Sequence, residues 1–287
     1  MENFDYVIEK IATTPLSEEP FKHLYIADFF SDEHFSQIIS SPEVNIIPTE
    51  SDEELLQALY AQNFKEITFP GTTTDIPHYL AWHKSRAVSR MTDVNCEGFG
   101  VTLRLQQTKP GTILDDVAKF YKSQRFWEAL ADRFQIDLSD VTTDIGLQKY
   151  LDGYEISPHP DIRKKALTFM INVNPSPFSE TLDIHTRYLK LKPEFQHVLK
   201  YWEENPKVDR CWVPWSSCDV YKQQPKNNSM VIFSPANDTL HAVKAAYDHL
   251  ATQRTQFYGN LWNKTSSATS LPRWDELCKQ LETQAAL

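Results

Sequence analysis

Two histidines and an aspartate are the residues whose types and spacing could support chemistry in this chain. His159 and Asp161 stand two positions apart, and His241 follows far along the sequence. In an extended segment, side chains at i and i+2 point the same way, so His159 and Asp161 can converge on one point while Pro160 stiffens the link. Two imidazoles and one carboxylate can occupy one face of an octahedral ferrous ion and leave three positions open. The spacing therefore predicts a reactive iron centre.

The residues around the two motifs strengthen this interpretation. A lone His-x-Asp is common by chance, and a lone histidine in an apolar strand reads as a hydrogen-bonded core residue. Residues 150–158 (YLDGYEISP), however, predict a strand, a turn and a second strand that places His159 near a strand end. Residues 230–243 (MVIFSPANDTLHAV) predict an apolar strand, a polar turn and then His241. These contexts favour a metal site over unrelated core histidines.

Arg254 supplies a possible second half of the site. Residues 253–262 alternate as a strand, so Arg254, Gln256 and Tyr258 share one face. Burying an arginine destabilises a protein unless a carboxylate pairs with the charge. The planar guanidinium group can bind a carboxylate through two parallel hydrogen bonds. We expect Arg254 to bind a carboxylate beside the metal.

Other polar residues are candidates for the same carboxylate. Asn172 interrupts an apolar run and could add a hydrogen bond, or it could only prepare the turn at Pro175. Lys244 and Arg210 are fallback partners, although neither stands in so regular a strand. The sequence leaves these alternatives open.

The elements that must position these residues change in character along the chain, with helices first and short strands later. We expect helices from Ser31 and over residues 52–63, 115–134 and 193–204, with Ser31 as an N-cap and a break near Ser123. We expect strands at residues 21–30, 100–106, 146–150, 166–173, 182–189, 212–221, 230–233 and 255–262. This order indicates an α+β fold with helices on one face of a mostly antiparallel sheet system.

Composition narrows the function classes. A net charge of −10 over 287 residues argues against a nucleic-acid-binding face, which needs clustered Lys and Arg. No run of 18 apolar residues or apolar leader occurs, so we expect a cytoplasmic protein with no membrane contact. Four cysteines without a CxxC pair (Cys96, Cys211, Cys218 and Cys278) are typical of reduced thiols, although Cys211 and Cys218 could chelate a metal.

The chain resembles the iron(II)/2-oxoglutarate-dependent oxygenases, and within them the prolyl-hydroxylase-like branch. The resemblance rests on residues 150–161 (YLDGYEISPHPD), 166–174 (ALTFMINVN), 230–243 and 254–262 (RTQFYGNLW), and on the opening FKHLYIADFFSDEHF at residues 21–35. It implies a double-stranded β-helix, also called a jelly roll or cupin-like barrel, with helices packed on the major sheet. It also implies one domain: a support region at 1–145, a barrel core at 146–265 with an insert at about 179–225, and a helix at 266–287.

The resemblance also implies site roles. His159, Asp161 and His241 would bind Fe(II), and Arg254, helped by Tyr150 and Asn172, would bind the distal carboxylate of 2-oxoglutarate. Three departures stand against this: a proline-rich turn at residues 175–179, the long insert, and a longer spacing from His241 to Arg254 than the family usually has. The last makes Arg254 less secure than the metal ligands.

The implied chemistry uses Fe(II), O2 and 2-oxoglutarate, which is decarboxylated to succinate while a C–H bond is hydroxylated. Asp161 argues for hydroxylation, because related halogenases place a small residue there.

Substrate identity is not fixed by the sequence. Candidate substrate contacts are Arg104, Arg163 with Lys165, and Trp215 in the aromatic-rich insert. Each has a simpler interpretation: a solvated strand face, a solvated turn and packing of the insert on the barrel. We expect a small-molecule substrate, with a protein side chain, a non-catalytic cupin-like binding protein or an inert scaffold as alternatives. The segment 271–287 could dock on its own barrel or form a homodimer contact.

Overall fold

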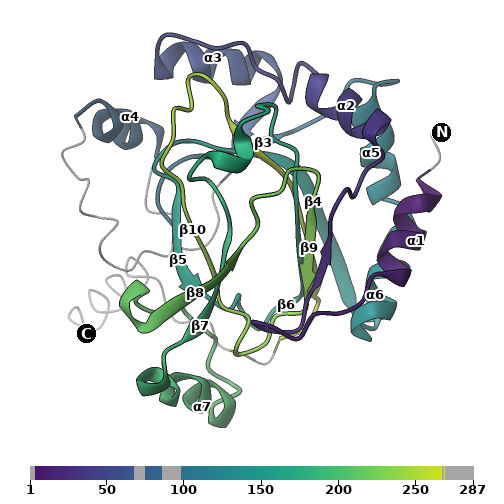
Figure 1. The fold of residues 1–287 in the computed structure, drawn as a ribbon, viewed down its shortest axis with the longest axis vertical. Coiled ribbons are helices and arrows are strands. Elements are labelled where there is room, and N and C mark those ends of the chain that lie inside the picture. The colour runs from purple at the N-terminus through teal and green to yellow at the C-terminus, as the bar shows by residue number, and fades with distance from the viewer. Residues whose placement is uncertain (1–3, 68–74, 86–97, 267, 269–287) are drawn as a thin grey trace, which may run out of the picture.

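A computed structural model describes residues 4–67, 75–85, 98–266 and 268, and shows helices combined with two antiparallel sheets (Figure 1). The large sheet has the strand order β1-β9-β6-β11-β4-β3-β2, and the small sheet has the order β5-β10-β7-β8. The large sheet contains β1 (Leu24–Ile26), β2 (Phe64–Glu66), β3 (Thr102–Leu105), β4 (Val141–Tyr150), β6 (Lys165–Asn172), β9 (Met230–Phe233) and β11 (Arg254–Asn263). The small sheet contains β5 (Glu155–His159), β7 (Arg187–Leu191), β8 (Cys218–Gln223) and β10 (His241–Lys244).

Helices cover one face of the large sheet, as the sequence predicted. The helices of the described residues are α1 (Asp5–Thr13), α2 (Asp32–Ser40), α3 (Asp52–Ala61), α4 (Ile76–Ser85), α5 (Ile113–Tyr121), α6 (Gln124–Phe134) and α7 (His197–Glu204). Of these, α7 packs on the small sheet instead. The Tyr121 ring of α5 lies 5.3 Å from the Phe257 ring of β11, and the Phe126 ring of α6 lies 5.6 Å from the Phe169 ring of β6. Each such buried ring stabilises the fold by roughly 1.5–3 kcal/mol. Gly259 makes room, since a Cβ there would lie 2.3 Å from the Phe169 ring.

The opposite face of the large sheet carries polar side chains. Along β11, Phe257 faces the helices, while Arg254 and Gln256 face the small sheet. Gln256 stands opposite Gln148 of β4 and Asn172 of β6 in the register of the strands. The two sheets meet across this polar face, because Arg254 Nη2 donates to Thr186 Oγ1 at 3.2 Å. The residues with chemical potential therefore lie between the sheets.

The small sheet is backed by the insert. In Figure 1, α7 lies beside β7 and β8. Trp202 of α7 is 2% exposed and packs with Leu189 of β7, Val213 and Cys218. This packing confirms the simpler interpretation for that tryptophan. Within the described residues, no helix is long and apolar enough to cross a membrane.

The structure confirms several predicted elements, whereas three predicted strands have different bounds. The Ser31 hydroxyl accepts a hydrogen bond from His34 N, and Ser123 caps α6 where the break was expected. The strand predicted at 21–30 is limited to β1, because Phe29 and Phe30 are buried in the core without joining a sheet. The strands predicted at 182–189 and 212–221 begin only at Arg187 and Cys218. At residues 21–30 the apolar run reflects burial and not strand pairing, whereas before β7 only Asp183 forms an isolated bridge, to Ala246.

Two helices, α1 and α4, were not predicted from the sequence. The helix predicted at 266–287 lies outside the described residues except for residues 266 and 268, and Cys96 and Cys278 also lie outside them.

Candidate metal centre

The two sheets bring His159, Asp161 and His241 together. His159 ends β5 and His241 begins β10, and the two residues are partners in the antiparallel register of these strands. His159 Nε2 lies 3.5 Å from Asp161 Oδ1, and His241 Nε2 lies 3.9 Å from Asp161 Oδ2. The three side chains, separated along the chain, thus converge on one point.

The tautomer of each histidine is set by a backbone carbonyl. His159 Nδ1 lies 2.8 Å from Ser157 O, and His241 Nδ1 lies 2.9 Å from Thr239 O. Because a carbonyl can only accept, Nδ1 carries the proton and the Nε2 lone pair faces Asp161. Burial, and next the charge of His159, lowers the pKa of His241 to about 3. The His241 imidazole is therefore a neutral potential ligand at physiological pH.

Asp161 is held as an ionised, fixed carboxylate. Lys165 Nζ donates to Oδ1 at 2.7 Å, and Thr168 Oγ1 donates to Oδ2 at 2.8 Å. Burial alone would raise the pKa of Asp161, but the nearby positive charge of Lys165 outweighs burial and holds this pKa well below its usual range. The backbone φ of Asp161 is 64°, in the left-handed region that aspartate tolerates better than most residues. Such backbone conformations are enriched at functional sites.

The spacing of the triad fits a metal ion better than direct hydrogen bonds. The Nε2 to carboxylate distances of 3.5 and 3.9 Å exceed those of ordinary N–H···O bonds. Neighbouring ligands of a regular octahedral ion stand roughly 3 Å apart. Each imidazole has its outer nitrogen fixed, as metal-ligating histidines require. The donor set and its orientation therefore fit a ferrous ion.

Arg254 is buried with part of its guanidinium unpartnered. It begins β11 opposite Tyr150, is 2% exposed, and has its Cζ 4.3 Å from the centre of the Tyr150 ring. Nη2 donates to Thr186 Oγ1, but Nη1 has no hydrogen-bond partner among the residues that the structure describes. In the described part of the chain no carboxylate forms an ion pair with it. A buried cation of this kind fits a site for an anionic group such as a carboxylate.

A hydrogen-bond relay orients Tyr150. The Gln148 amide is satisfied when its oxygen faces Arg104 Nη2, 2.6 Å away, and its nitrogen faces the Tyr150 hydroxyl, 2.5 Å away. The amide nitrogen then donates, which leaves the Tyr150 hydroxyl proton for another acceptor. Burial raises the pKa of Tyr150 to about 12, so the proton is retained.

Arg104 anchors that relay. It was predicted as a substrate contact, or else as part of a solvated face. In the structure its guanidinium is committed to Asp144, with Nη1 donating to Oδ1 at 2.7 Å. Gly146 allows this crossing, because a Cβ there would lie 2.8 Å from Arg104 Cδ. Arg104 stands opposite Gln148 on the polar inner face and is paired within the chain, so it is not part of a purely solvated face, and its contact with a substrate stays a prediction.

Asn172 and Arg163 have their polar groups engaged within the protein. Asn172 Nδ2 donates to Gln224 O at 3.0 Å, and its Oδ1 accepts from Gln256 at 2.6 Å. Arg163 Nε donates to Val208 O, and Nη2 donates to a second carbonyl of the insert. Asn172 thus ties strands together and Arg163 ties the insert to the metal-bearing segment.

Trp215 and Lys244 both lie near Glu155 of β5. The Trp215 indole donates from Nε1 to Glu155 Oε1 at 2.7 Å, and Lys244 Nζ lies 4.0 Å from Oε2. Trp215 belongs to a short helical turn, Trp215–Ser217, of the insert. The tryptophan predicted as a substrate contact therefore fastens the insert to the small sheet.

Cys211 and Cys218 are free thiols. Burial raises the pKa of the Cys218 thiol to about 11. Among the residues that the structure describes, neither belongs to a group of three or more potential metal ligands.

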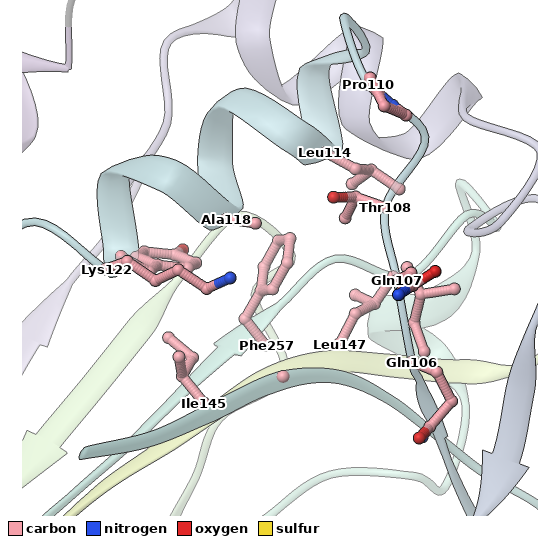
Figure 2. A pocket seen from close by; sticks show the side chains of 13 residues that line it. Gln106, Gln107, Thr108, Pro110, Leu114, Ala118, Lys122, Ile145, Leu147 and Phe257 are labelled. Carbon is pink, nitrogen blue, oxygen red and sulfur yellow. The ribbon is translucent and has the colours of Figure 1, made fainter. Parts of the chain in front are cut away.

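A cavity of about 470 Å³ lies on the helix-covered side of the large sheet (Figure 2). Thr108, Leu147 and Phe257 line it, and the Lys122 side chain reaches toward it from the end of α5. Leu147 and Phe257 alternate with Gln148 and Gln256, which point to the other face. The cavity is thus separated from the triad by the sheet.

Sequence reasoning missed several contributors, namely Gln148, Thr168 and Thr186. The sequence contains a weak signal for two of them. Gln148 on β4 and Thr168 on β6 are polar residues that alternate with apolar ones along their strands, as Gln256 does on β11. Thr186 precedes β7 and carries no periodic signal.

A second group of potential ligands lies away from the triad. It consists of Asp52 at the start of α3, His83 of α4 and His249 before β11. Asp52 Oδ2 lies 2.8 Å from His83 Nδ1, and Oδ1 lies 2.6 Å from His249 Nε2. Asp152 completes it, with Oδ2 3.1 Å from His83 Nε2 and its backbone N–H donating to His249 Nδ1 at 2.9 Å. We refer to these four residues as the Asp52 network.

Comparison with known proteins gives fold neighbours. A prolyl hydroxylase from Trichoplax adhaerens, in complex with a hypoxia inducible factor oxygen degradation domain peptide fragment, is 11% identical, with a TM-score of 0.46 over 91% of this chain and 89% of that chain. A Pseudomonas putida prolyl-4-hydroxylase is 10% identical, with a TM-score of 0.44 over 92% of this chain and 100% of that chain. No family model and no curated protein matches the sequence. Both TM-scores lie below 0.5, so these neighbours carry no argument about activity or substrate.

Proposed function

We propose that this protein is an Fe(II)/2-oxoglutarate-dependent dioxygenase that hydroxylates a C–H bond. One observation carries the proposal: the Nε2 lone pairs of two histidines face one carboxylate, and the same inter-sheet space contains a buried arginine whose Nη1 has no partner. A cupin-like binding protein would have no need of the second feature.

The two sheets are proposed to form a double-stranded β-helix. From β4 to β11 the chain passes between the large and the small sheet at every step except β7 to β8, which are neighbours in the small sheet. This alternation brings the ends of β5 and β10 together, and so it positions His159 and His241.

Each residue has a proposed task. His159, Asp161 and His241 would hold Fe(II), and Arg254 would hold the distal carboxylate of 2-oxoglutarate, with Tyr150 donating its hydroxyl proton to that co-substrate. When bound, Fe(II) with 2-oxoglutarate and O2 supplies the oxidising chemistry that yields succinate, carbon dioxide and a hydroxylated product.

The protein's other residues fix geometry and restrict water. Lys165 and Thr168 fix both oxygens of Asp161, which maintains the ligand's direction. The side chains of the triad are only 15%, 4% and 7% exposed for His159, Asp161 and His241. Because the triad is this deeply buried, we propose a small molecule as substrate, with a protein side chain as the alternative.

The test is anaerobic addition of Fe(II) and 2-oxoglutarate to the metal-free protein. A weak visible metal-to-ligand charge-transfer band is expected from wild type and none from His159→Ala. An Arg125→Ala variant, which changes an exposed surface arginine, is the control and should keep the band. Absence of the band in wild type at saturating iron would remove the basis of the proposal.

Arg254→Ala tests the co-substrate site separately. Losing a charged hydrogen bond costs about 1.5–3 kcal/mol, so the 2-oxoglutarate concentration for half-maximal band intensity should rise roughly 10–100-fold. Iron affinity, measured without 2-oxoglutarate, should stay the same. Equal loss of both affinities would identify Arg254 as a structural residue.

A further inference from the structure

Arg210 is a second buried arginine with a guanidinium nitrogen, Nε, that lacks a hydrogen-bond partner among the described residues. It is 7% exposed. Within the described residues, its only hydrogen bond comes from the backbone N–H, which donates to Asp209 Oδ1 at 3.0 Å. A buried cation that lacks a hydrogen-bonded anion destabilises the folded protein by roughly 3–5 kcal/mol. Such a group suits a ligand that supplies the missing charge.

The insert places Arg210 beside the metal-bearing segment. Val213 N donates to Pro158 O at 2.7 Å, and Arg163 N donates to Asp209 Oδ1 at 2.7 Å. The segment containing Arg210 is therefore clamped on both sides of it to the stretch that carries His159 and Asp161. The Thr239 hydroxyl donates to Pro160 O at 2.9 Å, which draws the loop before His241 to the same place.

The electrostatic surroundings agree with this position. Burial, and next the charge of Arg163, lowers the pKa of Arg210 to about 10, while Asp161, Asp209 and Asp238 act in the opposite direction. Arg210 stays protonated at physiological pH.

Arg163 shows what a purely structural arginine looks like in the same region. Its Nε and Nη2 both donate to backbone carbonyls of the insert. Arg210 lies two residues after Val208, yet within the described residues its guanidinium donates no such hydrogen bond. The contrast indicates that Arg210 serves a molecule from outside the chain.

We propose, resting on the dioxygenase activity proposed above, that Arg210 binds a carboxylate of the substrate, so that the substrate is a small organic acid. A guanidinium fork matches a carboxylate with two parallel hydrogen bonds. A doubly charged phosphate is disfavoured, because the negative charges of Asp161, Asp209 and Asp238 already act on this single cation. Arg254, on the large sheet, is left for 2-oxoglutarate.

The test is titration of the anaerobic Fe(II)/2-oxoglutarate complex with benzoate, using calorimetry. With 2-oxoglutarate saturating, benzoate should bind wild type and should bind Arg210→Gln at least about tenfold more weakly, the effect of one charged hydrogen bond. Arg210→Lys should also bind weakly, because it keeps the charge but loses the fork. Arg125→Gln is the matched control and should bind as wild type does. Benzamide and inorganic phosphate should bind much less than benzoate.

The same titration on metal-free Arg254→Met protein separates this proposal from the dioxygenase proposal, because it needs neither iron nor 2-oxoglutarate. Benzoate binding that depends on Arg210 in that background is expected even if no charge-transfer band forms. Unfolding by urea adds a second readout: Arg210→Gln should be as stable as wild type or more so. No benzoate binding to wild type, equal binding to Arg210→Gln, preference for phosphate, or marked destabilisation by Arg210→Gln would each overturn the assignment.

Discussion

Among the described residues, two groups each contain two histidines and an aspartate that lie close together, and one of these groups has the geometry of a metal site. In the triad, the imidazole Nε2 atoms stand 3.5 and 3.9 Å from Asp161. In the Asp52 network, the imidazole nitrogens stand 2.8 and 2.6 Å from Asp52, which is hydrogen-bonding distance. The composition is the same, but the second group leaves no space for an ion.

The outer nitrogens explain the difference. In the triad each Nδ1 faces a backbone carbonyl, so each Nε2 lone pair is available to a metal. In the Asp52 network both nitrogens of His83 face carboxylates, as in a doubly protonated imidazolium. His249 accepts from Asp152 N–H and must donate from Nε2 to Asp52. What a histidine can bind is thus decided by the partner of its second nitrogen.

The largest expected difference between the two groups is in metal binding. His241→Ala should lose iron affinity by more than the roughly 10–100-fold that loss of an outer hydrogen-bond partner costs. His249→Ala should bind iron as wild type does, with one equivalent per chain. Iron stoichiometry and affinity by anaerobic calorimetry give the measurement. A second equivalent of iron that disappears in His249→Ala would break the comparison.

The next difference is in the stability of the metal-free protein. Asp52→Asn should destabilise the fold by about 3–5 kcal/mol, because it leaves the buried charge of His83 without one of its two anions. His159→Ala should cost only about 1 kcal/mol, since that ring makes one backbone hydrogen bond and lies at the site's entrance. Urea unfolding of both variants measures this. Similar losses would mean that the triad is equally part of the structural framework.

The smallest difference concerns pH. Burial, and next the charge of His83, lowers the pKa of His249 below 6.5. The unfolded chain therefore takes up this proton first as pH falls, so the contribution of neutral His249 to stability is complete above pH 6.5 and declines below it. Between pH 7.5 and 5.5, the fall in melting temperature should be smaller for His249→Gln than for wild type. Parallel curves for the two proteins would contradict the assigned tautomer. Other buried histidines, such as His241, contribute equally to both proteins and cancel in this comparison.

Much of the fold was predictable because its signals are local. Ser31 and Ser123 cap helices as their types suggest, and the alternation in residues 253–262 matches β11. The two strands predicted in the insert begin later than expected. Val213, for example, is buried by packing on the small sheet, and a local pattern cannot distinguish such packing from strand pairing.

Candidate roles were harder to predict than candidate residues. Asn172, Arg104, Arg163 and Trp215 are all polar or aromatic groups near the inner face, yet each is committed to a partner within the chain. Arg104, for example, pairs with Asp144 of the neighbouring strand. This pairing depends on the register of the two strands and on the space that Gly146 leaves for the Arg104 side chain. Sequence alone could not decide which arginines would be left for ligands.

The sequence by itself determined the ligand types, the two-residue spacing of His159 and Asp161, and the strand character around them, because these depend on side-chain chemistry and short-range backbone geometry. Only the tertiary structure decided that His241 faces them, that Arg254 and Arg210 keep unpartnered guanidinium nitrogens, and that the Asp52 network is closed by hydrogen bonds. The reason is physical: a buried polar group binds whichever partner the fold brings within about 3 Å, and that partner is set by long-range pairing of strands and helices.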